Sequence, residues 1–194
     1  MKEVAVREWV MSKEEILKKV LTAKRYRKMV LCYRTCLEGD ECYDRGYVVD
    51  ANERYVLLHI VDDRIELDGY VVLRTEDITE VLCEFDNYKF IEKALAIRRM
   101  EPERPTLVDL TSMEAVLRSI DEHFPLLVVH REEVNGDECW IGSLDSVSDK
   151  TFTLRAMDPD AKWSGPKRIR FDEVTRVEFD GGYETALAQV AGIH

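Results

Sequence analysis

The feature of this sequence that most constrains its fold is an internal repeat with a separation of about 96 residues. The tetrapeptide GDEC occurs at Gly39 to Cys42 and again at Gly136 to Cys139, followed by an aromatic residue each time. Three further pairs of like residues keep nearly the same separation: Gly46 and Gly142, Ile78 and Val174, and Tyr88 and Tyr183. The ordered spacing indicates two diverged copies of one structural unit.

Each copy is predicted to begin with a helix. Ser12 and Glu15 have the spacing of a capping box, and Thr111 and Glu114 have the same spacing in the second copy. Apolar stripes with helical periodicity follow each candidate cap: Ile16, Leu17, Val20 and Leu21, and Val116, Leu117 and Ile120.

Five short strands are predicted to follow the helix in each copy, because these segments are rich in β-branched and aromatic residues. In the first copy they fall near residues 29–37, 42–50, 55–60, 69–75 and 78–84, and in the second near 125–133, 138–147, 151–157, 167–171 and 174–179. A short helix closes each copy, at 88–99 and 183–193. Between the copies, Pro102 and Pro105 indicate a boundary, since proline interrupts helix and sheet.

The expected fold is mainly β with α-helices (α+β). It consists of two tandem repeats, at residues 1–97 and 111–194, joined by a linker at 98–110. Gly46 and Gly142 inside the second strands permit sharp bending, and "EDITEV" and "DEVTRV" lead into the last strands. In this pattern each repeat resembles the small five-stranded barrels of Sm-like and Src-homology type proteins. The stretch 46–81 is also similar to bacterial proteins with no assigned activity. The resemblance implies a barrel in each repeat and carries no catalytic role.

Composition restricts the function. The formal net charge of -11 disfavours nonspecific binding to nucleic acid or to an anionic membrane. No apolar run approaches the ~18 residues that a membrane span needs, so we expect a cytoplasmic protein without a membrane partner. The five cysteines form no C-x-x-C pair, which favours reduced thiols over a disulfide framework or a zinc site.

The GDEC segments offer carboxylates and thiols, but neighbouring side chains on a strand point to opposite faces and do not converge on one ion. The alternative is a structural hairpin, with Cys42 and Cys139 packed inward. Three residues separate Cys42 from Gly46, but only two separate Cys139 from Gly142. This offset predicts a bulge near Asp44 and Arg45 in one copy only.

The acidic loops after the third strands, with Asp62 and Asp158 at equivalent places, are read either as solvated turns or as cation sites. The four histidines belong to no catalytic motif, and no glycine-rich phosphate loop is present. We therefore expect no enzyme activity, no catalytic residue, no metal and no cofactor.

The third strand of the first copy is apolar on both faces. Val56, Leu58 and Ile60 should face the interior of the repeat, as Phe152, Leu154 and Ala156 should in the second copy. The opposite face carries Tyr55, Leu57 and His59, which require cover from the same chain or from a partner. Trp140 and Trp163 are either core residues or interface anchors. The leading prediction is a non-catalytic module that binds a protein partner or self-associates.

The alternative function is binding of RNA or single-stranded nucleic acid. The Sm-like pattern and a basic first helix, with Lys24, Arg25, Arg27 and Lys28, favour it. Such a run of charge is also the usual solvated face of an amphipathic helix. The net charge of the chain weighs against this alternative.

Overall fold

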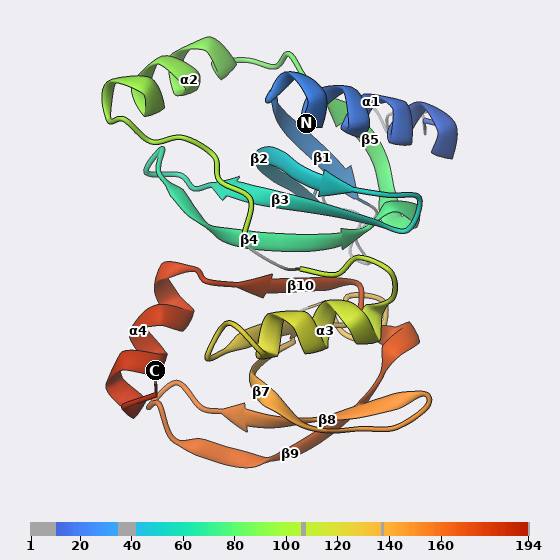
Figure 1. Ribbon diagram of the computed structural model, residues 1–194, viewed down its shortest axis with the longest axis vertical. Coiled ribbons are helices and arrows are strands. Elements are labelled where there is room, and N and C mark those ends of the chain that lie inside the picture. The colour runs from blue at the N-terminus through green and yellow to red at the C-terminus, as the bar shows by residue number, and fades with distance from the viewer. Residues whose placement is uncertain (1–10, 35–41, 106–107, 137, 194) are drawn as a thin grey trace, which may run out of the picture.

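The computed structural model describes residues 11–34, 42–105, 108–136 and 138–193. We call residues 11–97 the first repeat and residues 111–193 the second. The first repeat contains α1 (Lys13–Tyr26), β1 (Met29–Arg34), β2 (Cys42–Ala51), β3 (Tyr55–Val61), β4 (Leu67–Arg74), the 3-10 turn η1 (Thr75–Asp77), β5 (Ile78–Leu82) and α2 (Tyr88–Ile97). Figure 1 shows this repeat above the second one.

The second repeat has the same order of elements. It contains α3 (Met113–Asp121), β6 (Leu127–His130), β7 (Cys139–Val147), β8 (Thr151–Met157), β9 (Trp163–Arg170), η2 (Phe171–Glu173), β10 (Arg176–Phe179) and α4 (Gly182–Ala191). The predicted helix, five strands and closing helix are therefore present in both repeats. The described residues of the segment between α2 and α3 form neither helix nor strand. The division into two domains there stays a prediction.

The helix starts follow local capping chemistry. At α1 the Ser12 side chain accepts from the backbone of Glu15 and the Glu15 carboxylate accepts from the backbone of Ser12, so the predicted capping box is present. At α3 the prediction is wrong by one residue. Ser112, and not Thr111, is the N-cap, and its Oγ accepts a hydrogen bond from the N–H of Ala115. A serine and a threonine in succession both fit the capping pattern, so spacing alone did not separate them.

The ten strands of the described residues form one antiparallel sheet in the order β5-β1-β2-β3-β4-β10-β6-β7-β8-β9. Within each repeat the order is the same, and the two halves join where β10 pairs with β4. In that ladder Val177 lies opposite Val72 and Phe179 lies opposite Tyr70. Figure 1 shows β4 and β10 side by side at the boundary.

The prediction of two closed barrels is not supported, because the sheet is continuous and does not close on itself. The ladder explains the difference. To close a first barrel, β4 would have to pair with β5, but its free edge is taken by β10 from the other repeat. In the second repeat β9 ends the sheet with β8 as its neighbour. The mainly β, α+β class is confirmed.

The largest core cluster spans both repeats. Leu57, Tyr70 and Val72 of the first repeat pack with apolar side chains of α3 and with Val177 and Phe179 of β10. A separate cluster beneath α1 contains Val56 and Leu58, with Ile60 packed against it, as predicted. Phe152, Leu154 and Ala156 are likewise buried in the second repeat.

The bulge prediction is wrong. Pairing between β1 and β2 is continuous from Met29 opposite Tyr47 to Arg34 opposite Cys42. Instead, both repeats shift register at the same later place, between Val48 and Asp50 on β2 and between Leu144 and Ser146 on β7. The cause is that the two GDEC cysteines are not equivalent.

The register identifies the equivalent residues. Tyr33 lies opposite Tyr43 in the first repeat, where His130 lies opposite Cys139 in the second. Tyr43, and not Cys42, therefore takes the place of Cys139, and the extra residue of the first repeat precedes the equivalent part of the strand. No described helix is both long and apolar enough to cross a membrane.

Candidate binding groove at the junction of the repeats

A buried ion network joins the two repeats. Arg34 on β1 has only 3% of its side chain exposed, and its Nε lies 2.9 Å from Oδ2 of Asp44 on β2. The same guanidinium pairs with Glu132 of the second repeat, while Arg176 on β10 approaches Asp44 to 3.3 Å. Burial opposes the charge of Arg34, but Asp44 and Glu132 outweigh it and raise the pKa of Arg34. Removing one partner of such a buried network costs about 3–5 kcal/mol, so the network fixes how the strands meet.

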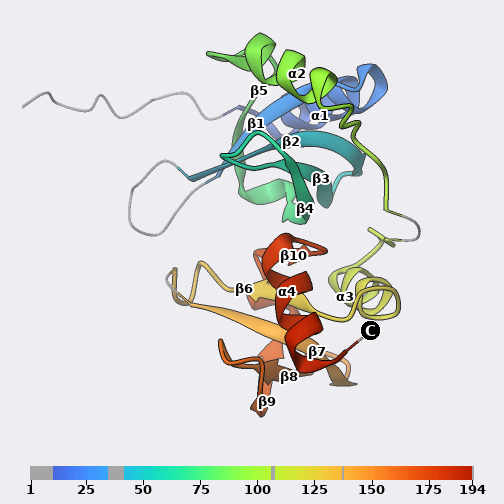
Figure 2. The same cartoon turned by 90° about the vertical axis from the view of Figure 1, so that its left-hand side faces the viewer.

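A cavity of about 350 Å³ lies beside this network, and we call it the junction cavity. It lies between the β3–β4 turn and the start of α4, which Figure 2 shows on the same side of the molecule. Its lining includes six carboxylates against two guanidinium groups. The carboxylates belong to Asp44, Asp62, Asp63, Asp68, Glu178 and Glu184, and the guanidinium groups to Arg45 and Arg176. The junction cavity is therefore acidic.

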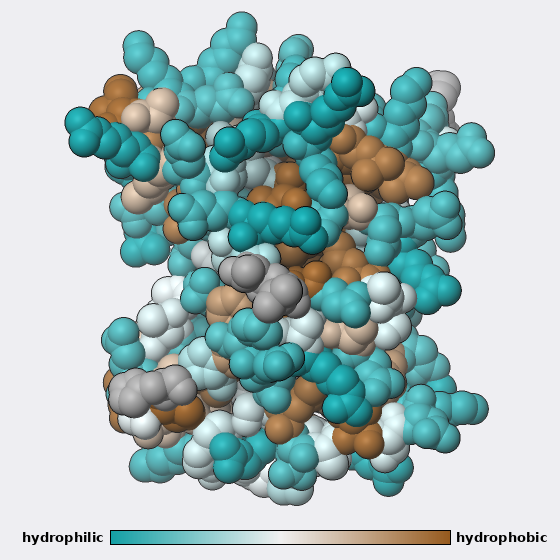
Figure 3. Space-filling view, in the orientation of Figure 1, coloured by the Kyte–Doolittle hydropathy of each residue, from teal (hydrophilic) through white to brown (hydrophobic). Residues whose placement is uncertain are grey.

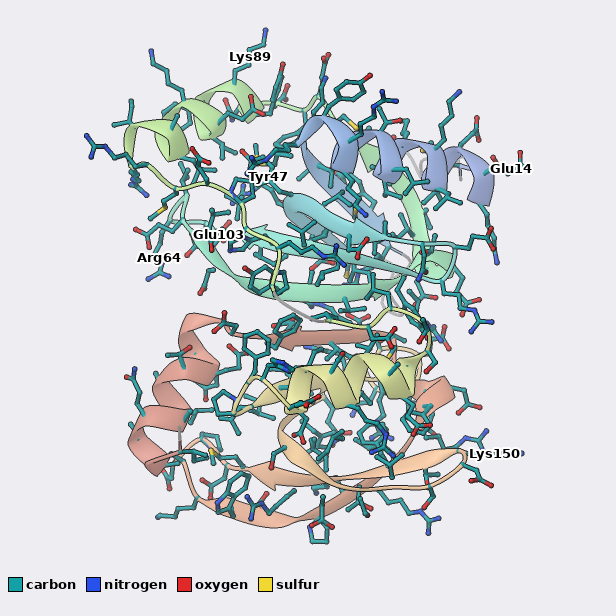
Figure 4. All side chains as sticks on the ribbon, in the orientation of Figure 1. Glu14, Tyr47, Arg64, Lys89, Glu103 and Lys150 are labelled. Carbon is teal, nitrogen blue, oxygen red and sulfur yellow. The ribbon has the colours of Figure 1, made fainter. Side chains whose placement is uncertain are left out.

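Both arginines of the junction cavity are engaged within the chain. The Arg45 guanidinium donates to the carbonyl oxygens of Val61 and Asp62, at 3.2 and 2.6 Å. Arg176 pairs with Asp44 and also with Glu178. Arg64, at the tip of the β3–β4 turn in Figure 4, is likewise occupied, because its Nε lies 2.7 Å from Oδ2 of Asp62. These cations stabilise the fold, and none of them forms a salt bridge with Glu184, the remaining carboxylate of the lining.

Glu184 is the carboxylate of the junction cavity with the least compensation. Only 7% of the residue is exposed. Its carboxylate accepts a hydrogen bond from its own backbone N–H, and within the described residues no salt bridge reaches it. Burial raises the pKa of Glu184, and the charges of Glu178 and Asp68 raise it further, whereas the charge of His130 acts in the opposite direction. Burial and the charge of Asp68 also raise the pKa of nearby Asp180.

A second cavity, of about 830 Å³, adjoins the first, and we call it the aromatic cavity. It lies where β1, β2 and β5 meet the start of α2. Its apolar lining consists of Leu31, Tyr33, Tyr43, Ile65, Leu82, Phe85, Phe90 and Ile91. Phe90 is 62% exposed and Tyr43 is 50% exposed, so large apolar surface is presented to solvent. The rings of Tyr33 and Tyr43 lie 5.4 Å apart.

The two cavities share Tyr43, Arg45 and Asp63 in their linings. They therefore form one groove, mainly apolar at the α2 end, where Asp86 and Asn87 also line it, and acidic at the α4 end. In the orientation of Figure 3 the visible face is mostly polar, and its apolar groups form small patches. A groove of this composition can bind a molecule that combines apolar surface with positive charge.

The predicted partner residues on β3 are covered by the chain itself. Leu57 is 1% exposed and belongs to the core shared by the two repeats, with half-buried Tyr55 packed against the same cluster. The His59 ring stacks on Tyr70, with centroids 4.3 Å apart, and its Nδ1 accepts a hydrogen bond from the N–H of Glu103. Figure 4 shows Glu103 on the linker that passes this strand. The second apolar face of β3 is therefore covered by other parts of the same chain, which was one of the two alternatives that the sequence left open.

The two candidate tryptophans lie in the second repeat, away from the groove lining. The Nζ of Lys167 is 3.7 Å from the ring centroid of half-buried Trp140. The guanidinium carbon of Arg155 is 3.7 Å from that of Trp163, whose exposure is 39%. Each indole therefore has a cationic neighbour from its own repeat.

The four basic candidates lie in the last turn of α1 and just after it, and their surroundings differ. Lys24 forms a 2.6 Å salt bridge with Asp50, and Arg27 donates to the carbonyl oxygen of Pro102. Arg25 stacks over its neighbour Tyr26, and Lys28 is exposed. Two of the four candidate nucleic-acid contacts are thus already engaged.

The GDEC segments are described only in part. Residues 39–41 and 137 lie outside the described residues, and the prediction that Cys139 packs inward is wrong, because it is exposed. Cys42 is half-buried and disulfide-bonded, contrary to the expected reduced state, whereas Cys32, Cys83 and Cys139 are free thiols.

The acidic loops have a structural function. Asp62 Oδ1 accepts from the backbone N–H groups of Arg64 and Glu66, and Asp158 Oδ1 accepts from those of Asp160 and Lys162. Both carboxylates thus hold the hairpin turn of their repeat. Within the described part of the chain, no group of three or more His, Cys, Asp and Glu residues could hold a metal ion.

Sequence reasoning missed the groove, because its lining comes from both repeats and from strands distant in sequence. One signal was available. Leu82 and Glu178 occupy equivalent places, 96 residues apart, yet one is apolar and the other is charged. Such a contrast between copies marks positions whose surroundings differ, and both residues line the groove.

No family model matches the chain, and no curated protein matches it. Among solved structures, a crystal structure of K. pneumonia MrkH shows 9% identity and a TM-score of 0.20, over 98% of this chain and 95% of that one. A structure of K. pneumonia MrkH in its apo state shows 10% identity and a TM-score of 0.19, over 92% of each chain. At these TM-scores the likeness carries no argument about fold or function.

Proposed function

We propose that this chain is a non-catalytic interaction module that binds a segment of a partner protein in the groove between α2 and α4. The observation that carries the proposal is the joining of an exposed aromatic cavity to an acidic one through Tyr43, Arg45 and Asp63. Protein interfaces are enriched in aromatic anchors that fill such hollows, surrounded by charged groups that select the partner.

The groove favours a protein segment over a nucleic acid. Its carboxylates repel phosphates, and phosphate contacts supply most of the affinity of nucleic-acid binding. Outside the groove, Lys24 and Arg27 of the basic helix are engaged with Asp50 and with the linker. The nucleic-acid alternative has its own test. A salt-sensitive affinity for single-stranded RNA that is lost on neutralising Lys24, Arg25, Arg27 and Lys28 supports it.

Self-association through the outer edges of the sheet is less favoured than a groove-bound partner. On β5 the carbonyl oxygen of Thr79 accepts from the N–H of Met11, and that of Val81 accepts from Nζ of Lys19. On β9, Pro166 lacks a backbone N–H, and Lys167 and Arg168 add charge. Charged residues and proline are the usual means by which a sheet edge resists pairing. Light scattering over a concentration series tests this alternative.

The proposal is tested by selecting random displayed peptides on the purified full chain and measuring the affinity of synthetic versions of the binders. Phe90→Ser removes an aromatic side chain from the groove, and Tyr26→Ser removes one elsewhere. The two residues are matched in exposure, at 62% and 61%. We expect Phe90→Ser to weaken binding by about tenfold or more, which corresponds to about 1.4 kcal/mol, and Tyr26→Ser to leave it unchanged. Binders insensitive to Phe90→Ser contradict the proposed site.

A further inference from the structure

The acidic end of the groove lacks a cation at one definite position, the carboxylate of Glu184. This side chain is more than nine-tenths buried, lines the junction cavity and has no salt bridge within the described residues. The N-terminus of α4, where Glu184 lies in the first turn, favours a negative charge. Burial and the charges of Glu178 and Asp68 nevertheless raise its pKa, so the helix end does not compensate fully.

The basic groups near this carboxylate have other partners, and His130, whose charge acts on Glu184, lies 3.0 Å from Oε1 of Glu178. Arg176 pairs with Asp44 and Glu178, and Arg45 donates to backbone carbonyls of the β3–β4 turn. Arg64 is held by Asp62, with Asp68 3.8 Å from its Nη2. Moving any of them to Glu184 would break an existing contact. A cation supplied from outside would gain the attraction without that loss.

The walls of the junction cavity also suit a cation. Tyr183 and Tyr43 line it and are 56% and 50% exposed, so their ring faces are accessible from solvent. Aromatic faces attract ammonium and guanidinium groups, and partial desolvation strengthens the attraction. An organic cation therefore fits the combination of carboxylate and phenol rings better than a hard metal ion, which requires clustered oxygen ligands.

The other end of the same groove has a different requirement. Around Leu82 and Phe90 most of the side chains that line the aromatic cavity are apolar, and Asp86 on its rim is exposed to solvent, so the cavity favours a large apolar side chain. A free polyamine would satisfy the acidic end only. A peptide can satisfy both ends at once, because its side chains project from one backbone at fixed intervals.

Building on the proposed function, we propose that the groove selects a peptide segment in which a lysine or arginine lies close in sequence to a large apolar residue. The basic side chain occupies the junction cavity beside Glu184, between Tyr43 and Tyr183. The apolar side chain occupies the aromatic cavity, against Phe90 and Leu82. The affinity of the complex decreases as the salt concentration rises, because one of its two contacts is electrostatic.

The test compares the sequences of peptides selected on three forms of the full chain. On the unmodified protein we expect binders that carry a basic and a large apolar residue together. On Glu184→Gln the basic residue should no longer be enriched while the apolar one persists, and on Phe90→Ser the reverse should hold. Peptides that bind in the groove but show no enrichment of basic residues overturn this inference alone. Peptides whose binding is insensitive to Phe90→Ser, or a selection that yields no binding peptide, overturn the proposed function.

Affinities measured by fluorescence anisotropy complete the test, and the comparison of two peptides on the unmodified protein does not depend on the folding of a variant. The probe is a labelled binder from the selection, compared with the same peptide in which citrulline, a neutral analogue, replaces arginine. On the unmodified protein we expect the neutral peptide to bind about tenfold more weakly. On Glu184→Gln, checked for folding by circular dichroism, the two peptides should bind alike. Equal affinities on the unmodified protein, or binding of spermidine that displaces the whole peptide, contradict the inference.

Discussion

The two repeats place the same strands in the same register but use the equivalent positions for different chemistry. In the first repeat Leu31 lies opposite Leu82, and both line the aromatic cavity. In the second repeat the equivalent pair is Val128 and Glu178, and Glu178 contacts His130 and Arg176 in the junction network. The same structural unit thus forms an apolar cavity in one copy and a charged interface with the other repeat in the second copy.

The position in the sheet explains this difference. β5 lies at the end of the sheet, so the side chains around it can remain open to solvent. β10 lies between β4 and β6, where its residues meet the other repeat. A charged residue at an internal interface needs partners, and His130 and Arg176 provide them for Glu178. The groove exists because the solvent-exposed edge around β5 in the first repeat adjoins the interface where β10 meets β4.

The third strands show the same contrast. His59 on β3 is covered by the linker and by Tyr70, whereas its equivalent on β8 is the exposed Arg155. The face of β3 that carries Leu57 became part of a core shared with α3. The first repeat therefore depends on the second for cover, and this dependence can be measured.

The largest effect is expected from Phe179→Ala. Phe179 is fully buried and contacts Tyr70 across the junction, with ring centroids 5.3 Å apart. Removing such a side chain leaves a cavity and costs about 3–5 kcal/mol. Because the core is shared, amide hydrogen exchange should accelerate in β2 and β3 as well as in β6 and β7. Loss of protection in the second repeat alone would show that the repeats unfold independently.

Alanine at the two equivalent glycines should have the next largest effect. A Cβ on Gly46 would lie 2.4 Å from the carbonyl oxygen of His59, and one on Gly142 would lie 2.2 Å from that of Arg155. We expect each substitution to cost about 1–3 kcal/mol, because the neighbouring backbone must move. Gly165→Ala is the control, since a Cβ there meets nothing within 4 Å. Urea denaturation gives all three values, and a cost at Gly165 equal to the others contradicts the steric reason.

Sequence patterns predicted what is local and repeated. Alternation of Val56, Leu58 and Ile60 identified the inward face of β3. The paired glycines, predicted from the sequence to permit bending, lie where a Cβ would clash with the neighbouring strand in both copies. These features depend on a few neighbouring residues. They are therefore visible in a single chain without knowledge of its tertiary contacts.

The junction could not be predicted in the same way. Pairing of β4 with β10 joins residues about 100 apart, and neither strand differs in composition from one that would close a barrel. The groove depends on that pairing, because Asp68 and Glu184 come together only when β10 lies beside β4. The GDEC match failed for the opposite reason: it is a local identity that the strand register does not preserve.

A smaller effect, dependent on pH, is expected from His59. Burial lowers the pKa of this imidazole to about 4, although the charge of Asp68 acts in the opposite direction. The unfolded chain, with an ordinary histidine pKa of about 6.5, binds the proton more readily between these values. The contribution of neutral His59 is therefore present above pH 6.5 and is lost as the pH falls towards 4.

The change that tests this is His59→Gln. The variant should lose less free energy of unfolding than the unmodified chain between about pH 6.5 and 4.5, because no buried imidazole has to be protonated. Urea denaturation of both proteins at matched pH values gives the difference. If the two profiles run parallel, His59 is not held neutral by its cover of Tyr70 and the linker.

The smallest effects concern the helix caps, where sequence and structure disagree at one residue. Ser12→Ala should cost about 0.5–2 kcal/mol, because the side chain of Ser12 accepts from the N–H of Glu15. Ser112→Ala should cost a similar amount, since its Oγ accepts from the N–H of Ala115 at 3.1 Å. Thr111→Val should cost only a few tenths, because the cap belongs to its neighbour. Chemical denaturation of the three variants decides between the two assignments. A larger loss of unfolding free energy at Thr111 than at Ser112 restores the capping box predicted from the spacing with Glu114. The reverse order places the start of α3 at Ser112.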